Sequence, residues 1–245
     1  MWVVGRDTAA DHQTRPVAGG TREAPEGRAD KYGRENRAGS DVPSASMGDR
    51  GDMFQIRIHG RGGQGVVTAA ELLSVAAFLE GREAQAFPTF GSERTGAPVV
   101  AFCRIDDNVI RVREPITEPD AVIVQDPTLV HQVDLFGGLG DDGYLLLNTT
   151  RTFAELGLGA YVERFAAGRC VTVPATDIAR KRLGRPLPNA ALLGAFAALT
   201  HQVSMRSVAS AIYARFPGQT GGRNVSAAEE AYALIAGATQ ELSHA

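Results

Sequence analysis

Four glycines near residue 60 have the spacing of a turn that holds a phosphate group. They lie between an alternating stretch at 54–59 and a run of good helix formers at 66–79. A strand that enters a helix through such a turn directs backbone N–H groups and the helix N-terminus at one point, which favours an anion. The spacing also fits the dinucleotide pattern G-x-G-x-x-G. We therefore predict a phosphate or cofactor contact at Gly60, Gly62, Gly63, Gln64 and Gly65.

Two features of the sequence leave the ligand of this turn open. A dinucleotide site would show an acidic residue at the end of the next strand, where Ala86, Phe87 and Pro88 stand instead. A nucleoside-triphosphate loop would continue with Lys and then Ser or Thr, and this turn does not. The residues alone therefore allow two interpretations, a turn that binds phosphate and a tight turn that only joins a strand to a helix.

A second candidate site is the turn-rich loop at 87–98. It carries two aromatic residues and the adjacent pair Glu93 and Arg94. Loops at the ends of a parallel sheet are where α/β folds place function. We predict that Glu93 and Arg94 contact a ligand phosphate or a partner subunit. The alternative is a solvated ion pair that contributes little energy.

The elements that must position these residues alternate between strands and helices. The hydrophobic patterns predict strands at 54–59, 84–87, 99–105, 121–124, 143–148 and 170–173, with 109–112 pairing as a hairpin with 99–105. They predict helices at 66–79, 129–136, 176–183, 189–200, 204–216 and 225–242. This alternation indicates an α/β fold: a Rossmann-like, mostly parallel sheet with helices on both faces and a helical C-terminal part.

Residues 1–52 differ from the rest of the chain. Their apolar residues are scattered without helical or strand periodicity among many Gly, Pro, Arg and acidic residues. Such a segment buries too little surface to offset its conformational entropy. We expect a disordered N-terminal extension at 1–52, or a segment upstream of the true start, because Met47 and Met53 are both candidate start residues. Residues 53–245 form the predicted folded domain.

The composition argues against several classes of protein. With 25 Lys and Arg against 28 Asp and Glu, the chain offers no basic field for nucleic acid. No tract of about twenty apolar residues would span a membrane, and the N-terminus lacks the apolar region of a secretory signal, so we expect a cytoplasmic protein. The two cysteines, Cys103 and Cys170, are expected to be reduced core thiols, since an iron–sulfur cluster needs about four cysteines. His59 is expected to be a core histidine.

An ordered set of motifs resembles the gamma subunits of 2-oxoacid:ferredoxin oxidoreductases. The set begins with the glycine turn at 60–65 and the loop at 87–98, and continues with the segments 126–129, 175–179 and 184–195. The resemblance spans roughly residues 53–242. The loop motif Phe-Pro-x-Phe-Gly-x-Glu-Arg with Gly-Ala-Pro looks most like the pyruvate enzyme. Thr95 departs from the family, which commonly has Arg or Lys there, so any contact that this basic side chain makes with a ligand or a partner is expected to be absent from this chain.

The resemblance implies a division of labour within a complex that converts pyruvate to acetyl-CoA by oxidative decarboxylation and reduces ferredoxin. It implies that thiamine diphosphate and Mg²⁺ are held by the alpha and beta subunits and the iron–sulfur clusters by beta and delta. This chain then holds no cofactor alone and carries neither catalytic nor metal-binding residues. Its implied partners are the alpha, beta and delta subunits, ferredoxin through the complex, and coenzyme A as a candidate ligand.

Three alternatives to this interpretation stay open. The chain could belong to the branched-chain 2-oxoacid or indolepyruvate enzyme of the same family. It could be a free-standing Rossmann-type nucleotide-binding protein. It could also be a pure assembly module, in which the glycine turn only closes the joint between a strand and a helix.

Overall fold

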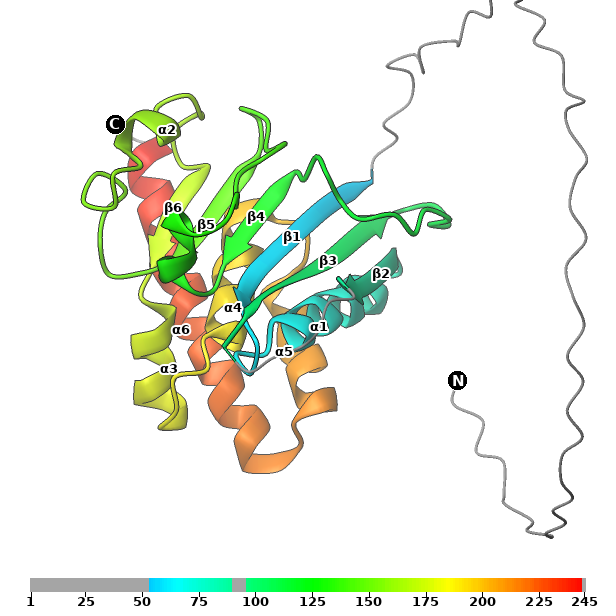
Figure 1. Ribbon diagram of the computed structural model, residues 1–245. Helices are drawn as coiled ribbons and strands as arrows, with labels where there is room; N and C mark the ends of the chain where they lie inside the picture. Colours follow the sequence, from blue (N-terminus) through cyan, green and yellow to red (C-terminus); the bar gives the residue numbers. More distant parts are fainter. Residues whose placement is uncertain (1–52, 90–95, 244–245) are drawn as a thin grey trace, which may run out of the picture. The chain divides into compact units, whose positions relative to one another are not determined.

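The computed structural model describes residues 53–89 and 96–243. Within these residues six strands form one sheet in the order β2-β3-β1-β4-β5-β6 (Figure 1). Strands β1, β4, β5 and β6 pair in parallel, whereas β3 runs antiparallel to both β1 and β2. The strands are β1 Phe54–Arg61, β2 Glu83–Pro88, β3 Pro98–Asp106, β4 Ala121–Val124, β5 Tyr144–Asn148 and β6 Cys170–Val173.

The long helices of the described residues lie on one face of the sheet. Helix α1 packs on β1, β2 and β3, while α4 and α6 pack on the parallel half and α5 contacts both α1 and α6. The other face carries the 3-10 helix η1, the short helix α2 and the loops around them (Figure 1). The helices are α1 Val66–Leu79, η1 Pro127–His131, α2 Gly159–Val162, α3 Ala175–Leu183, α4 Asn189–Thr200, α5 Met205–Arg215 and α6 Gly218–Ser243.

The predicted fold class is confirmed by this arrangement. Five of the six described strands share one direction, because β2 and β1 both run antiparallel to β3. Helices lie on both faces, although unequally, and the C-terminal part from α3 onward is helical. The predictions for residues 1–52 concern a segment outside the described residues.

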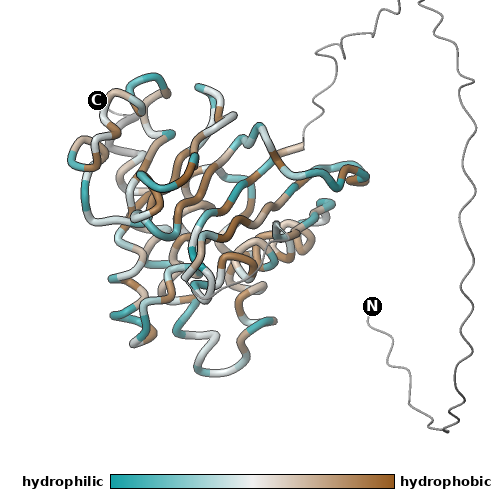
Figure 2. The backbone as a smooth tube through the Cα atoms, in the orientation of Figure 1, coloured by the Kyte–Doolittle hydropathy of each residue, from teal (hydrophilic) through white to brown (hydrophobic). Residues whose placement is uncertain are grey.

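A core of small residues joins the helices to the sheet. All residues of α4 are buried, and α4 contacts α6 closely. A Cβ atom built on Gly194 would lie 1.9 Å from the carbonyl oxygen of Ala228, so glycine at this position sets the approach of the two helices. Figure 2 shows the hydrophobic colouring concentrated along the central strands. The alanine- and leucine-rich stretch 189–200 is therefore the centre of the helical layer.

The predicted hairpin at 99–105 and 109–112 is wrong. Strand β3 is hydrogen-bonded to β1 on one side and to β2 on the other, so it has no free edge for a third partner. The segment 109–112 has no regular secondary structure. The buried guanidinium of Arg104 holds the stretch that follows by donating hydrogen bonds to the carbonyl oxygens of Val112 and Glu114, at 3.5 and 2.6 Å. The side chains of Val109 and Val112 in this segment are exposed.

Three predicted helix boundaries also need correction. The helix expected at 129–136 is only the short 3-10 turn η1, which Asp126 caps by accepting from the N–H of Thr128. Helix α3 begins at Ala175, one residue before the predicted start at 176, and has no side-chain cap within the described residues. Helix α6 begins at Gly218 and not near residue 225. Its Gly221 lies so close to α5 that a Cβ atom would stand 2.0 Å from the carbonyl oxygen of Phe216, and so the chain has glycine there.

Both cysteines are free thiols, as predicted. Cys103 is buried in β3, and burial raises the pKa of its thiol to about 12. Cys170 is partly exposed in β6, and burial raises the pKa of its thiol to about 11. These thiols remain protonated at neutral pH and are poor nucleophiles. Among the described helices, none is long and apolar enough to cross a membrane.

His59 is a core histidine at the end of β1, as predicted. Only 4% of it is exposed, and its Nε2 atom finds no partner among the described residues. Burial, assisted by the positive charge of Arg57, lowers the pKa of His59 to about 4. The folded protein therefore holds this imidazole neutral.

Replacing His59 with leucine is expected to reduce the amount by which the free energy of unfolding falls when the pH is lowered. An unfolded histidine titrates near pH 6.5, so the unfolded chain binds more protons than the folded chain from there down to about pH 4. Wild-type stability then falls across that window by up to about 3 kcal/mol. Urea unfolding at pH 7 and pH 5 measures the difference, with a leucine at the exposed His131 as control. An identical slope in wild type and His59→Leu would contradict the assignment.

Candidate functional site

A crevice opens between the carboxyl ends of β1 and β4. The chain leaves β1 toward α1 on the helical face of the sheet and leaves β4 toward η1 on the opposite face. Divergence of this kind marks the place where open α/β sheets bind ligands. A cavity of about 490 Å³ lies here. Its lining comes from the turn at 62–64, from the residues after β4, from the last residue of β5, from α3 and from the connection at 186–188.

The glycine turn has the geometry predicted for it. Gly63 and Gly65 adopt φ angles of 89° and 77°, a left-handed conformation that favours glycine. At Gly60 a Cβ atom would lie 2.6 Å from the side chain of Val66, so the turn can fold back only without a side chain. Gly65 precedes α1 without a side-chain cap among the described residues. The first N–H groups of α1 lack acceptors within the helix and are available to an anion.

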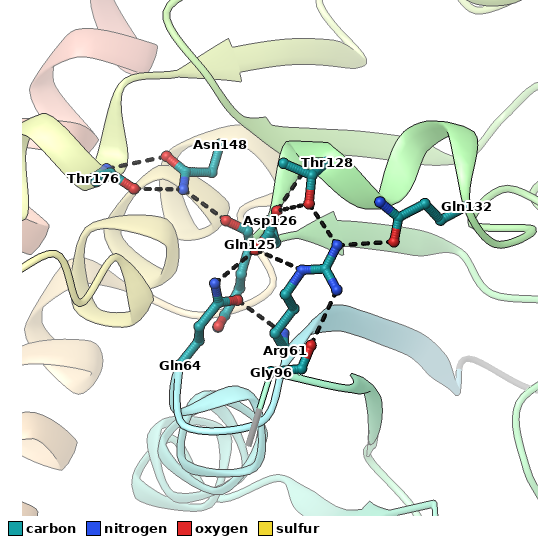
Figure 3. A network of polar contacts seen from close by, with 9 residues as sticks. All are labelled: Arg61, Gln64, Gly96, Gln125, Asp126, Thr128, Gln132, Asn148 and Thr176. Atoms are coloured by element: carbon teal, nitrogen blue, oxygen red, sulfur yellow. Dashed lines mark hydrogen bonds and ion pairs between the residues drawn. The ribbon is translucent and has the colours of Figure 1, made fainter. Parts of the chain in front are cut away.

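Arg61 and Gln64 tie this turn to the end of β4 (Figure 3). Gln64 accepts from the N–H of Arg61 at 2.8 Å and donates to Asp126 at 2.8 Å. Arg61 forms an ion pair with Asp126 at 3.2 Å and donates to the Thr128 hydroxyl at 2.7 Å and to Gln132 at 2.9 Å. The network fixes the turn against the crevice.

Arg61 and the turn also hold the start of β3. The guanidinium donates to the carbonyl oxygen of Gly96 at 3.0 Å. The N–H of Gly62 donates to Ala97 at 2.9 Å, and the N–H of Gly96 donates to Gly62 at 3.1 Å. The end of the loop at 87–98 is thus anchored beside the glycine turn.

Asp126 is ionised within this network. Burial by itself would raise the pKa of its carboxyl group, but hydrogen bonds from Thr128 and Gln64 and the charge of Arg61 outweigh burial and lower the pKa. Arg61 balances the negative charge, so the crevice is close to neutral on the η1 side. On the α3 side the cavity is lined by Arg180.

Asn148 connects the next two strands to the crevice (Figure 3). Its Nδ2 donates to the carbonyl oxygen of Gln125 at 2.7 Å and to the hydroxyl of Thr176 at 2.8 Å, and its Oδ1 accepts from the N–H of Thr176 at 3.0 Å. Gln125 is 1% exposed, and both polar atoms of its side chain lack partners within the described residues. The floor of the cavity is therefore polar and includes one unsatisfied amide.

The structure brings the predicted glycine-turn residues to one wall of this cavity. Gly62, Gly63 and Gln64 line it, Gly60 lies in β1 one residue before its end, and Gly65 immediately precedes α1. Glu93 and Arg94 lie outside the described residues. Within the part of the chain that is described, no group of His, Cys, Asp and Glu side chains could hold a metal ion.

Several residues of the crevice are missing from the sequence prediction: Arg61, Gln125, Asp126, Asn148 and Thr176. A signal for two of them is present in the sequence. Asp126 and Asn148 are polar residues at the ends of two apolar strands, and the carboxyl ends of parallel strands meet at one edge of the sheet. Arg61 lies inside the predicted glycine turn at 60–65, but nothing in the local pattern assigns its side chain, or that of Gln125, to the crevice.

Residues 55–234 match the family described as pyruvate ferredoxin/flavodoxin oxidoreductase. The chain belongs to this family. The pyruvate synthase subunit PorC of Methanothermobacter marburgensis is 49% identical over 180 residues, which cover 74% of this chain and 96% of that protein. The common gamma subunit of the pyruvate/ketoisovalerate oxidoreductases of Thermococcus kodakarensis is 49% identical over 182 residues, with the same coverage.

Solved structures of the family have the same fold. The pyruvate oxidoreductase subunit PORC of Thermotoga maritima is 36% identical, with a TM-score of 0.62 over 74% of this chain and 96% of its own. The 2-oxoglutarate:ferredoxin oxidoreductase of Magnetococcus marinus is 16% identical and matches with a TM-score of 0.57 over 76% of this chain and 31% of its own. This second likeness supports the fold alone. The family resemblance predicted from the motifs is confirmed.

Proposed function

We propose that this chain is the gamma-type subunit of a cytoplasmic 2-oxoacid:ferredoxin oxidoreductase that acts on pyruvate. The observation that carries the proposal is about 50% identity to pyruvate synthase subunits PorC over 96% of their length. In such a complex pyruvate is decarboxylated, coenzyme A receives the acetyl group and ferredoxin receives the electrons. Thiamine diphosphate, Mg²⁺ and iron–sulfur clusters supply this chemistry on the alpha, beta and delta subunits.

Within the complex, the role that fits this chain best is to bind the phosphates of coenzyme A at the glycine turn. The first N–H groups of α1 and the cavity of about 490 Å³ support this role. Gly60, Gly62, Gly63, Gln64 and Gly65 would form the binding turn. Glu93 and Arg94, in the loop whose end is anchored beside that turn, are proposed to contact the same ligand or a partner subunit.

Affinity purification of the tagged full-length chain from its own cells tests the assignment to a complex. The expected result is co-purification of three chains that resemble alpha, beta and delta subunits, together with bound thiamine diphosphate and iron. A chain that elutes alone and binds NAD(P) or flavin in calorimetry would instead be a free-standing nucleotide-binding protein. That outcome would reject the proposal.

The names of two relatives favour ketoisovalerate as a second candidate substrate. Relatives from Thermococcus kodakarensis and Pyrococcus furiosus are named common gamma subunits of pyruvate and ketoisovalerate oxidoreductases. One gamma chain can therefore serve two enzymes when the 2-oxoacid pocket lies on other subunits. Assays of the purified complex with pyruvate, 2-oxoisovalerate and indolepyruvate distinguish the candidates, since the preferred substrate should follow the alpha and beta chains that co-purify.

A further inference from the structure

The C-terminal half of α1 exposes a row of large apolar side chains, which we call the α1 face. Val75 is 41% exposed, Phe78 70% and Leu79 52%, and their helical spacing places all three on one side. The buried residues of α1 lie on its other side, and the glycine turn lies at its other end. Single apolar residues on a surface are normal, but a contiguous row is typical of a contact with another protein.

A groove lies beside the α1 face, between α1 and α5 (Figure 1). The two helices run antiparallel, since the N–H of Ser204 donates to Glu80 at 2.7 Å at one end, whereas the last residue of α5 lies beside Glu71 at the other. The groove has a volume of about 330 Å³, which gives room for an aromatic ring. Its lining is apolar apart from one acid and one base: Glu71, Leu72, Val75, Ala211, Ala214 and Arg215.

We propose that the α1 face binds a second copy of this chain, with the two α1 helices antiparallel about a two-fold axis at Val75. An antiparallel pair centred on this residue places Phe78, three positions after it, opposite Leu72 of the other copy, three positions before it. Each Phe78 then enters the groove of the other copy. The projecting ring and the groove belong to one surface, which is what an isologous contact requires.

The charges at the two ends of the groove fit the same arrangement. Glu80 lies five positions after Val75. Arg215 lies beside Glu71, which is four positions before Val75. The two-fold axis therefore brings Arg215 of each copy to Glu80 of the other. Within the described residues Arg215 has no acidic partner, and its guanidinium lies over the ring of Phe216. Opposite charges that face each other across an interface fix its register.

Sedimentation velocity of the purified full-length chain over a concentration series gives the dissociation constant of the dimer. One helix face is small beside the roughly 800 Å² per partner of a standard interface, so we expect a micromolar value. Phe78→Glu should weaken the dimer by about a hundredfold, because the two-fold axis makes each lost contact count twice. Leu234→Glu is the matched control, since Leu234 is 47% exposed on α6 and lies outside the groove.

An exchange of charges tests the register and the identity of the partner. Arg215→Glu and Glu80→Arg should each weaken the dimer by about tenfold, since each places like charges opposite one another. The chain with both substitutions should regain most of the lost affinity, because a second copy carries both changed residues. Glu80 also accepts from Ser204, so thermal unfolding checks that each variant remains folded.

Cross-linking tests the same contact in the chain as purified from its own cells. Because Val75 lies at the two-fold axis, Val75→Cys treated with a short bis-maleimide should join two copies of this chain, and Leu234→Cys should not. A wild-type chain that is monomeric at every concentration would overturn the proposal, as would equal dissociation constants for Phe78→Glu and Leu234→Glu. Cross-linking of Val75→Cys to a different chain would assign the α1 face to another subunit and reject the second copy.

Discussion

Replacing Gly194 with alanine is expected to destabilise the folded chain by about 3 kcal/mol, because a tightly packed core cannot absorb an added methyl group. The new Cβ atom would lie 1.9 Å from the carbonyl oxygen of Ala228, which belongs to the backbone of α6 and cannot rotate away. Helices α4 and α6 would have to separate along a completely buried contact. Urea unfolding of the purified chain measures the loss.

Gly237 provides the matched control in the same pair of helices. It lies on the exposed side of α6, and a Cβ atom there meets nothing within 4 Å. Alanine at this position should stabilise the helix by about 0.5–1 kcal/mol. If Gly194→Ala were as stable as Gly237→Ala, the close approach of α4 and α6 would be incorrect.

Replacing Gly65 with alanine is expected to raise the KM for coenzyme A by about tenfold in the assembled complex, since contact of an anion with a helix N-terminus is worth up to about 2 kcal/mol. Gly65 has a φ of 77° immediately before α1. A Cβ atom there would also stand 2.9 Å from Nδ2 of Asn189, at the start of α4. The backbone would have to shift to relieve the left-handed conformation and the contact with Asn189. This shift would turn the first N–H groups of α1 away from the crevice. Steady-state kinetics at saturating pyruvate measures the change.

Gly81, at the other end of the same helix, separates this effect from general strain. Its φ is 81°, and a Cβ atom there meets nothing within 4 Å. Both alanine variants should lose about 1–2 kcal/mol of stability from the left-handed backbone. Only Gly65→Ala should change the KM for coenzyme A. Equal KM values in the two variants would support the alternative in which the turn is purely structural.

Much of the fold follows from local sequence patterns. The bounds predicted for β4, β6, α1 and α4 agree with the structure, because an apolar run between polar residues or a stretch of Ala and Leu has few alternatives. The start of α6 was harder to predict. Its Gly221 and Gly222 weaken the helical pattern, and only packing against α5 explains why glycine is present.

The site is predictable only in part. The glycine turn is a local signal, since a positive φ and a close approach both require glycine within a few residues. The network around it is not local. Gln64 and Asp126 are 62 positions apart and meet because β1 and β4 are neighbours. The hairpin predicted with 109–112 also failed for a non-local reason, because β3 pairs with β1 on one edge and with β2 on the other. Pairing between strands that are distant in the sequence therefore determines both the contact of Gln64 with Asp126 and the absence of a strand at 109–112.

The most direct test of the proposed function is reduction of a viologen dye by the complex prepared with and without this chain. We expect the alpha, beta and delta subunits alone to show no reduction that depends on both pyruvate and coenzyme A. Addition of the purified chain should restore it. Full activity without the chain, at an unchanged KM for coenzyme A, would contradict the claim that it is a working subunit of a pyruvate:ferredoxin oxidoreductase.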